Sequence, residues 1–318
     1  MAMENNAETL ALGVTDPSKT EEARQDRHLE GKIDWIVFGI TSITAIAFIL
    51  WGFLSQLSLA ASASAAQSWV IINFGWFFVL TSTLFVIFVL WLAASRYGRI
   101  PLGRDGEVPE FRTVSWVAMM FSAGMGIGLM FFGVAEPLSH YMTPPPGSAA
   151  PQSNEAMQVA MATTLFHWTL HPWAMYAIVG LAIAYGTFRR GRSQLVSNAF
   201  RPLIGKHANG PLGRVIDMMA IFATLFGSAA SLGLGALQIA GGLEYNGWIE
   251  HPGKIFYLAI VTVLTIAFVA SAVSGIGKGI KWLSNVNMIL ALALAVFVFL
   301  VGPTLLMLNL LPTSIGVY

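Results

Sequence analysis

The sequence of residues 119–133 is MMFSAGMGIGLMFFG, a stretch without a charged side chain that carries glycine at positions 124, 126 and 128. It lies inside an apolar run, 114–141, that is long enough to cross a hydrocarbon core of about 30 Å as a helix. Each glycine costs about 1 kcal/mol in a helix relative to alanine. We therefore expect the helix to unwind over Gly124–Gly128, which is tolerated at membrane depth only where the backbone lines a cavity. Tight helix packing is the alternative explanation.

The composition of the whole chain indicates a membrane protein. Hydrophobic residues make up 56% and charged residues 10% of its 318 residues, whereas about a quarter of a soluble domain is charged. So few charges could not cover a water-facing surface, but a lipid-facing surface is apolar. The net charge of +1 indicates no nucleic-acid partner. The absence of cysteine excludes disulfides, thiolate metal sites and cysteine nucleophiles.

Seven apolar runs predict an all-α polytopic protein with seven transmembrane helices in the lipid bilayer. Several runs exceed the roughly 20 residues that a span needs, which indicates tilt or breaks within them. Residues 1–32 are polar, of mixed charge and without the apolar core of a signal peptide. They predict a disordered cytoplasmic tail ahead of a transmembrane domain, 33–318. The predicted spans are 33–57, 69–95, 114–141, 156–187, 214–242, 254–273 and 282–310.

Basic residues predict the orientation of these spans. They gather before the first span and in the segments 96–112, 189–214 and 278–281, which all lie on one side of the predicted bundle. Lys254 alone lies on the other side. The positive-inside rule makes the basic side the cytoplasm. We therefore expect a multi-pass protein of the cell membrane with a cytoplasmic N-terminus.

The fourth predicted span contains Phe166–Tyr176, FHWTLHPWAMY. At 100° per residue on a helix, Trp168, Trp173 and Tyr176 fall within an arc of about 140°. Aromatic faces attract a cation that cannot donate hydrogen bonds, as in the aromatic cages that bind quaternary ammonium groups. Anchoring at the membrane–water boundary is the alternative explanation. Because the segment begins about ten residues inside its span, the pattern favours a cage.

His167 and His171 are four residues apart in the same predicted span and share a helix face. A haem would need a second histidine pair on another span, and no carboxylate at membrane depth is apparent that would complete a metal site here. We expect packing roles for both histidines, no cofactor, and no metal other than the Na⁺ considered next. No Ser–His–acid or paired-carboxylate constellation is apparent, so we do not expect an enzyme.

The fifth predicted span places Thr224, Ser228 and Ser231 on one face, at spacings of four and three residues. Neutral oxygen ligands suit a hard cation such as Na⁺. Hydrogen bonding to the helix backbone is the alternative, and the residues alone favour it. Acids are scarce, with Glu136 and Asp217 near the predicted ends of spans. A bare cation such as choline would favour a buried acid, so this scarcity favours a zwitterion such as betaine.

Together these residues resemble the betaine–choline–carnitine transporter family. The resemblance extends over about 35–318 and is densest in Met119–Gly133, Phe166–Ala184, Thr224–Gln238 and Ser274–Asn287. It implies two leading helices followed by the first five-helix repeat of a five-plus-five inverted-repeat fold, assembled as a homo-oligomer, often a trimer. It also implies the site residues. The substrate-binding residues would be Gly124, Met125, Gly126, Gly128, Trp168, Trp173 and Tyr176, and the ion ligands would be Ser122, Met125, Thr224 and Ser228.

The function that the resemblance implies is secondary active transport. The protein would be a symporter that imports glycine betaine, or a similar quaternary-ammonium osmolyte, with Na⁺ by alternating access. Choline-transporting relatives often carry Asp where this chain has Gly128, which again favours betaine. A proton-coupled or exchange transporter of choline or carnitine is one alternative. A non-transporting truncated membrane subunit is another.

One departure from the family pattern concerns the second repeat. The sequence ends after the seventh predicted span, at Tyr318, whereas the family pattern continues for five further spans. The tryptophan-rich signature of the second repeat, the remaining sodium ligands and the basic C-terminal tail would lie there. We therefore expect an N-terminal part of a transporter, which does not transport alone because alternating access needs a second bundle.

Overall fold

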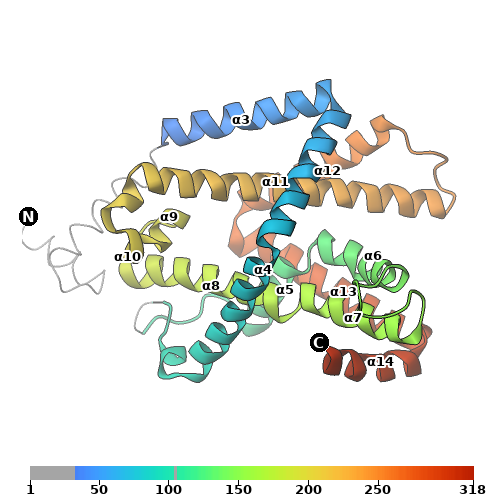
Figure 1. Cartoon of the computed structure of the whole chain (residues 1–318). Helices are drawn as coiled ribbons and strands as arrows, with labels where there is room; N and C mark the ends of the chain where they lie inside the picture. Colours follow the sequence, from blue (N-terminus) through green and yellow to red (C-terminus); the bar gives the residue numbers. More distant parts are fainter. Residues whose placement is uncertain (1–32, 104–105) are drawn as a thin grey trace, which may run out of the picture. The chain divides into compact units, whose positions relative to one another are not determined.

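The computed structural model describes residues 33–103 and 106–318, and this part of the chain consists of helices and turns without a β-strand (Figure 1). The predicted tail, 1–32, lies outside the described residues. Five helices of the described part are long and apolar enough to cross a membrane, or six if one bent pair counts as a single span. The all-α polytopic class is thereby confirmed. The count of seven spans and the repeat architecture stay predictions.

The chain divides into two compact units. The first comprises the described residues up to Glu107 together with Leu170–Leu225. Its longest helix, α4, packs against α8. The elements of this unit are α3 (Trp35–Leu54), α4 (Gln56–Ala94), η1 (Arg96–Arg99), α8 (Leu170–Ala184), the π-helical turn η2 (Tyr185–Arg189), α9 (Val196–Ala199), α10 (Arg201–Ile204), η3 (Gly205–Asn209) and the beginning of α11 (Pro211–Tyr245).

Local sequence explains where α3 begins. The side chain of Asp34 accepts hydrogen bonds from the backbone N–H groups of Ile36, at 3.0 Å, and Val37, at 3.3 Å. These amides have no partner inside the helix, so an acidic residue at this position stabilises the helix start. The apolar residues that follow make α3 a candidate span.

The second unit comprises Val108–Thr169 and Phe226–Tyr318. Within it α6 packs against α7, α5 against α13, and α7 against α14. Alanine allows the close approach at α7, where Ala156 and Ala160 are fully buried one turn apart. The elements of this unit are α5 (Thr113–Gly124), α6 (Ile127–Met142), α7 (Asn154–Trp168), the end of α11, α12 (Lys254–Ser274), the π-helical turn η4 (Ile276–Ile280), α13 (Lys281–Val301) and α14 (Thr304–Val317).

Apart from the third span, which was predicted to unwind, three predicted spans differ from the observed helices by a division or by more than four residues at an end. The second begins at Gln56 rather than at residue 69. The fourth is divided at Thr169 into two helices of 15 residues each, α7 and α8. The seventh ends at Val301, because the ring of Pro303 removes an amide donor and restricts the residue before it, and α14 follows as a separate helix.

Candidate functional site

A break divides the third predicted span. Helix α5 ends at Gly124 and α6 begins at Ile127, and the two helix axes are bent by 56°. Between them, Met125 has φ −86° and ψ 60°, and Gly126 has φ −86° and ψ −176°, neither of which is helical. The predicted unwinding is thereby confirmed at Met125 and Gly126, whereas Gly124 is the last residue of α5 and Gly128 lies in the first turn of α6. The break places the first amides of α6 next to Gly126, which has no side chain that could cap them.

The indole of Trp168, the last residue of α7, lies against the first turn of α6, next to this break. A methyl group built on Gly128 would lie 3.4 Å from Cη2 of Trp168. Phe132, one turn further along α6, stacks on the same indole with ring centroids 6.0 Å apart and planes inclined by 26°. Trp168 Nε1 donates a hydrogen bond to Oε2 of Glu136 at 2.6 Å. Three residues of α6, at successive turns, therefore hold the ring in one orientation.

This arrangement can attract a cation and an anion at the same time. The face of an indole is the strongest aromatic partner for a cation. The beginning of a helix carries partial positive charge and free amides, which favour a carboxylate. Both features lie within the second unit, at the break and at Trp168. A small zwitterion with an ammonium and a carboxylate group fits this combination.

The other two predicted cage residues, Trp173 and Tyr176, lie on α8 in the first unit. Their rings contact each other with centroids 5.9 Å apart. The arc computed for the three aromatics assumed one continuous helix, and this assumption was wrong because the helix is interrupted at Thr169, with φ −113° and ψ −114°. The cage itself stays a prediction.

Pro172 explains this interruption. A proline has no N–H, and its ring clashes with the carbonyl of the residue four positions earlier, which here is Trp168, the last residue of α7. In the structure Pro172 occupies the first turn of α8, where an amide would have no helical partner in any case. The sequence contained this signal, and the prediction of one long span overlooked it.

Of the predicted ion ligands, Ser122 and Met125 lie in the second unit. Ser122 Oγ donates to the carbonyl of Ser284 at 3.2 Å and accepts from Asn287 Nδ2 at 3.1 Å, so it joins α5 to α13. Met125 ends α5, where its N–H bonds the carbonyl of Phe121 at 2.7 Å. The carbonyl of Met125 lies in the non-helical segment between α5 and α6.

The predicted hydroxyl face of the fifth span lies on α11. Thr224 Oγ1 donates to the carbonyl of Ala220 and Ser231 Oγ to that of Gly227, each at 2.9 Å. These are the backbone hydrogen bonds that formed the alternative explanation. They use the hydroxyl protons and leave oxygen lone pairs as acceptors, so the sodium role of Thr224 and Ser228 stays a prediction.

Three residues at this site were not predicted to act: Phe132, Glu136 and His140. Glu136 Oε1 contacts His167 Nδ1 and lies 3.5 Å from His140 Nε2. The expectation that no carboxylate accompanies His167 was therefore wrong. His167 and His171 also do not act as a pair, because the interruption at Thr169 separates them and His171 Nε2 lies 3.3 Å from Thr83 Oγ1 on α4. The spacing of Glu136 and His140, four apart, was the available signal.

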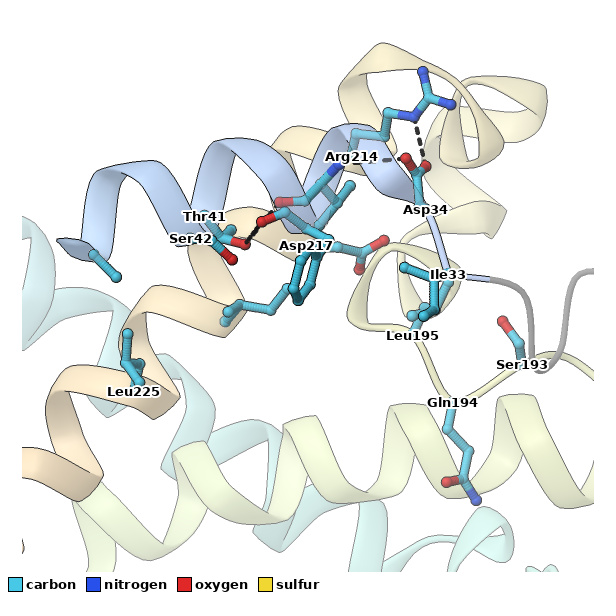
Figure 2. Close-up of a pocket in the computed structure, with 14 residues that line it drawn as sticks. Ile33, Asp34, Thr41, Ser42, Ser193, Gln194, Leu195, Arg214, Asp217 and Leu225 are labelled. Atoms are coloured by element: carbon cyan, nitrogen blue, oxygen red, sulfur yellow. Dashed lines mark hydrogen bonds and ion pairs between the residues drawn. The ribbon is translucent and has the colours of Figure 1, made fainter. Parts of the chain in front are cut away.

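A separate cavity of about 820 Å³ lies in the first unit, at the beginnings of α3 and α11 (Figure 2). At its rim Arg214 Nε donates to Oδ2 of Asp34 at 2.7 Å. This hydrogen bond lowers the pKa of the Asp34 carboxyl below its ordinary value of 3.8. Asp217, also in the lining, accepts from the backbone N–H and the hydroxyl of Ser197 at 2.9 and 2.8 Å. None of the predicted binding residues lines this cavity.

Comparison with known proteins agrees with the resemblance. The family model described as "BCCT, betaine/carnitine/choline family transporter" matches residues 36–318. The betaine/ectoine transporter LcoP of Corynebacterium glutamicum is 46% identical over 286 residues, which are 90% of this chain and 45% of that protein. The glycine betaine transporter OpuD of Bacillus subtilis is 48% identical over 284 residues, 89% of this chain and 54% of that protein.

A third relative is described as an osmo-dependent choline transporter, from Acinetobacter baylyi. It is 37% identical over 300 residues, 92% of this chain and 42% of that protein. The chain thus spans about half the length of the relatives that it matches. The match runs from residue 36 through all the candidate spans, which together indicate a multi-pass membrane protein. The chain belongs to the betaine/carnitine/choline transporter family and, as predicted, is not an enzyme.

Proposed function

We propose that this chain forms part of a secondary transporter that imports glycine betaine, or a similar quaternary-ammonium osmolyte, with Na⁺ by alternating access. One observation carries the proposal: the indole of Trp168 lies against Gly128 at the break between α5 and α6. Two of the relatives are described as betaine transporters, which supports the choice of substrate.

In the proposed binding mode the two ends of the zwitterion meet different parts of the second unit. The trimethylammonium group lies on the face of Trp168, which contributes about 0.5 to 2 kcal/mol. The carboxylate points to the first amides of α6, at Gly126 and Gly128, in the way broken transporter helices hold anionic substrate groups. Met125 belongs to the same segment. Trp173 and Tyr176 stay predicted substrate residues on α8.

The proposed coupling ion is Na⁺. In the second unit, the hydroxyl of Ser122 and the carbonyl of Met125 offer the neutral oxygens that a hard cation prefers. Thr224 and Ser228 on α11 stay predicted ligands on the strength of the resemblance. Assembly into a homo-oligomer, a trimer as the resemblance implies, is part of the proposal. The mass of the detergent-solubilised protein, measured by light scattering, tests that part, and a monomer would contradict it.

We also propose a cytoplasmic N-terminus. The basic residues of the segments on that side support it by the positive-inside rule, and two contacts of the first unit agree with the grouping, since each joins segments predicted on the same side of the membrane. Asp34 pairs with Arg214, and Arg189 Nη1 donates to the carbonyl of Gly103 at 3.0 Å. The chain has no cysteine, so single cysteines can be introduced. A thiol reagent that cannot cross membranes should label Ala150→Cys and not Gln194→Cys in intact cells. The reverse pattern would refute this orientation.

Substrate binding tests the function without requiring transport. Radiolabelled glycine betaine should bind the purified chain in lipid nanodiscs more tightly in Na⁺ than in K⁺, and glycine, which lacks the methyl groups, should not compete. Trp168→Ala should weaken binding roughly 3- to 30-fold, the range expected for one cation–π contact. Trp248→Ala is the matched control, because Trp248 is 77% exposed and lies outside the site.

The outcomes separate the alternatives. Equal affinity of Trp168→Ala and the unaltered chain would remove Trp168 from the site. Binding of choline or carnitine without regard to Na⁺ would favour a proton-coupled or exchange transporter. A helical, inserted chain that binds none of these compounds would favour a non-transporting membrane subunit.

A further inference from the structure

Two histidines and a glutamate converge in the second unit near the predicted outer end of α6. Glu136 and His140 lie one turn apart on α6, and His167 is the penultimate residue of α7. Glu136 Oε1 contacts Nδ1 of His167 and lies 3.5 Å from Nε2 of His140. One donor atom from each side chain lies within 4.8 Å of the other two. The packing of α6 against α7 creates this cluster from residues far apart in sequence.

The donor set is typical of a transition-metal site. Two imidazole nitrogens and one carboxylate oxygen are the ligands found in zinc sites that keep a fourth position open. Around a tetrahedral Zn²⁺ such ligand atoms lie roughly 3.4 Å from one another. Glu136 Oε1 and His140 Nε2 already have this separation, so a rotation of the partly exposed His167 side chain would complete the geometry. With neutral imidazoles the cluster carries one negative charge, which attracts a dication.

A second feature supports a preformed site. A hydrogen bond outside the cluster orients the carboxylate of Glu136, because Trp168 Nε1 donates to its other oxygen, Oε2, at 2.6 Å. Hydrogen bonds of this kind orient metal ligands and strengthen binding. The cluster is also accessible, because exposure rises from 14% for the Glu136 side chain to 24% for His140 and 47% for His167. An ion can therefore enter on the side of His167.

We propose that Glu136, His140 and His167 bind a divalent transition-metal ion, Zn²⁺ being the best fit. Na⁺ and Ca²⁺ fit less well, since these hard cations prefer oxygen ligands and two of the three donors are nitrogens. The site is distinct from the proposed Na⁺ ligands and from the substrate position on the face of Trp168. Its existence does not depend on the proposed transport function, and metal binding is measured without substrate.

Titration with Co²⁺, followed by displacement with Zn²⁺, tests this site. Co²⁺ bound by nitrogen and oxygen ligands in tetrahedral geometry absorbs visible light, so the spectrum reports the coordination as well as the affinity. The chain is purified without a polyhistidine tag, treated with chelator and placed in nanodiscs. We expect one Co²⁺ per chain, displaced by Zn²⁺. His140→Ala and His167→Ala should each weaken binding at least tenfold.

The chain offers a matched control in a second histidine–acid pair of the same unit. His251 Nδ1 lies 3.3 Å from Glu244 Oε1, and the His251 side chain is 99% exposed. His251→Ala should leave the stoichiometry and the affinity unchanged. His140→Gln serves as a second variant if His140→Ala loses helical circular dichroism. Failure of the unaltered chain to bind Co²⁺, or equal binding by the helical His140, His167 and His251 variants, would overturn the proposal.

Discussion

The helix breaks at Met125–Gly126 and at Thr169 have opposite origins. At the first, glycine removes the preference for helix, and the backbone of the unwound segment stays accessible next to the start of α6. At the second, the ring of Pro172 clashes with a helical carbonyl of Trp168, four positions earlier. The helix therefore ends there and a new helix, α8, begins at Leu170. The first break creates a place where a ligand can approach the backbone. The second fixes where Trp168 ends one helix.

The two breaks meet at the same indole. Trp168 ends α7 because of the second break, and its ring lies on Gly128 beyond the first. The glycine break therefore exposes the backbone that forms the binding surface, and the proline break positions the aromatic ring of Trp168 beside it. Pro137 illustrates that proline alone does not suffice, since α6 continues through it from Ile127 to Met142.

Restoring helix preference at the glycine break should have the largest effect. In Gly126→Ala/Gly128→Ala both new methyl groups are tolerated sterically, since Gly126 has open space and Gly128 would make an ordinary contact with Trp168. The alanine at position 126 favours the continuous helix by about 1 kcal/mol. Position 128 is already helical in α6, and its new methyl group lies against the indole of Trp168. Glycine betaine affinity should then fall roughly 30-fold, the equivalent of about 2 kcal/mol, measured by equilibrium binding.

Gly133→Ala provides the control for this comparison. Gly133 lies in the continuous part of α6 and has no atom within 4 Å of a new methyl group. It should stabilise the helix and leave the affinity unchanged. An unchanged affinity of the double variant would mean that the glycine break does not form the binding surface.

Removing the proline should have an intermediate effect. In Pro172→Ala the carbonyl of Trp168 can accept a helical hydrogen bond, so the amides of Leu170 and His171 should enter a continuous helix. Their hydrogen exchange should slow about tenfold, because exchange follows the free energy of local opening. Mass spectrometry of peptides covering 165–176 measures it.

Pro137→Ala is the counterpart, and we expect no new protection in α6 because that helix is already continuous. If exchange at Leu170 and His171 stays fast in Pro172→Ala, then side-chain contacts hold the break instead. Those contacts would be His167 with Glu136 and His171 with Thr83.

A substitution at the start of α3, where no helix is broken, should have the smallest effect, and it serves as a reference for the two breaks. Asp34→Asn keeps a side chain that can cap α3 but removes the charge that pairs with Arg214. Both side chains are 41% exposed, so the pair should contribute less than about 1 kcal/mol. Thermal unfolding in detergent, followed by circular dichroism, compares the variant with the unaltered chain.

The pH dependence has a definite sign. The hydrogen bond from Arg214 lowers the folded-state pKa of Asp34 below 3.8, so the ionised form is favoured by folding. The stability from this pair is fully present above about pH 4 and is lost as the pH falls through the lowered pKa. The difference between Asp34→Asn and the unaltered chain should vanish in that acidic range. A difference that persists there would assign the effect to the cap rather than to the charge.

Local rules predicted much of the helical structure. The apolar runs placed the candidate spans, and the alternate glycines placed the break between α5 and α6. The break at Thr169 was missed although its cause, Pro172, is equally local. The break lies three residues before the proline, at a threonine that gives no signal of its own, and the prediction extended helical periodicity through it.

The partners of Trp168 and His167 could not be predicted in this way. Glu136 is separated from them by 32 and 31 residues, and Asp34 is separated from Arg214 by 180. No periodicity or spacing connects residues on different helices. The spacing of Glu136 and His140 was visible, but it does not reveal that a third ligand faces them from α7.

The sequence by itself determined that this is a helical membrane protein of the betaine/carnitine/choline transporter family and that α5 and α6 separate at the glycines. Apolarity and backbone preference are properties of each residue and its neighbours, so they can be predicted from the amino-acid sequence alone. Only the tertiary structure decided that Phe132 and Glu136 hold the Trp168 ring and that His140 and His167 share one carboxylate oxygen. These contacts depend on how α6 packs against α7, and that packing is settled by shape over many residues at once.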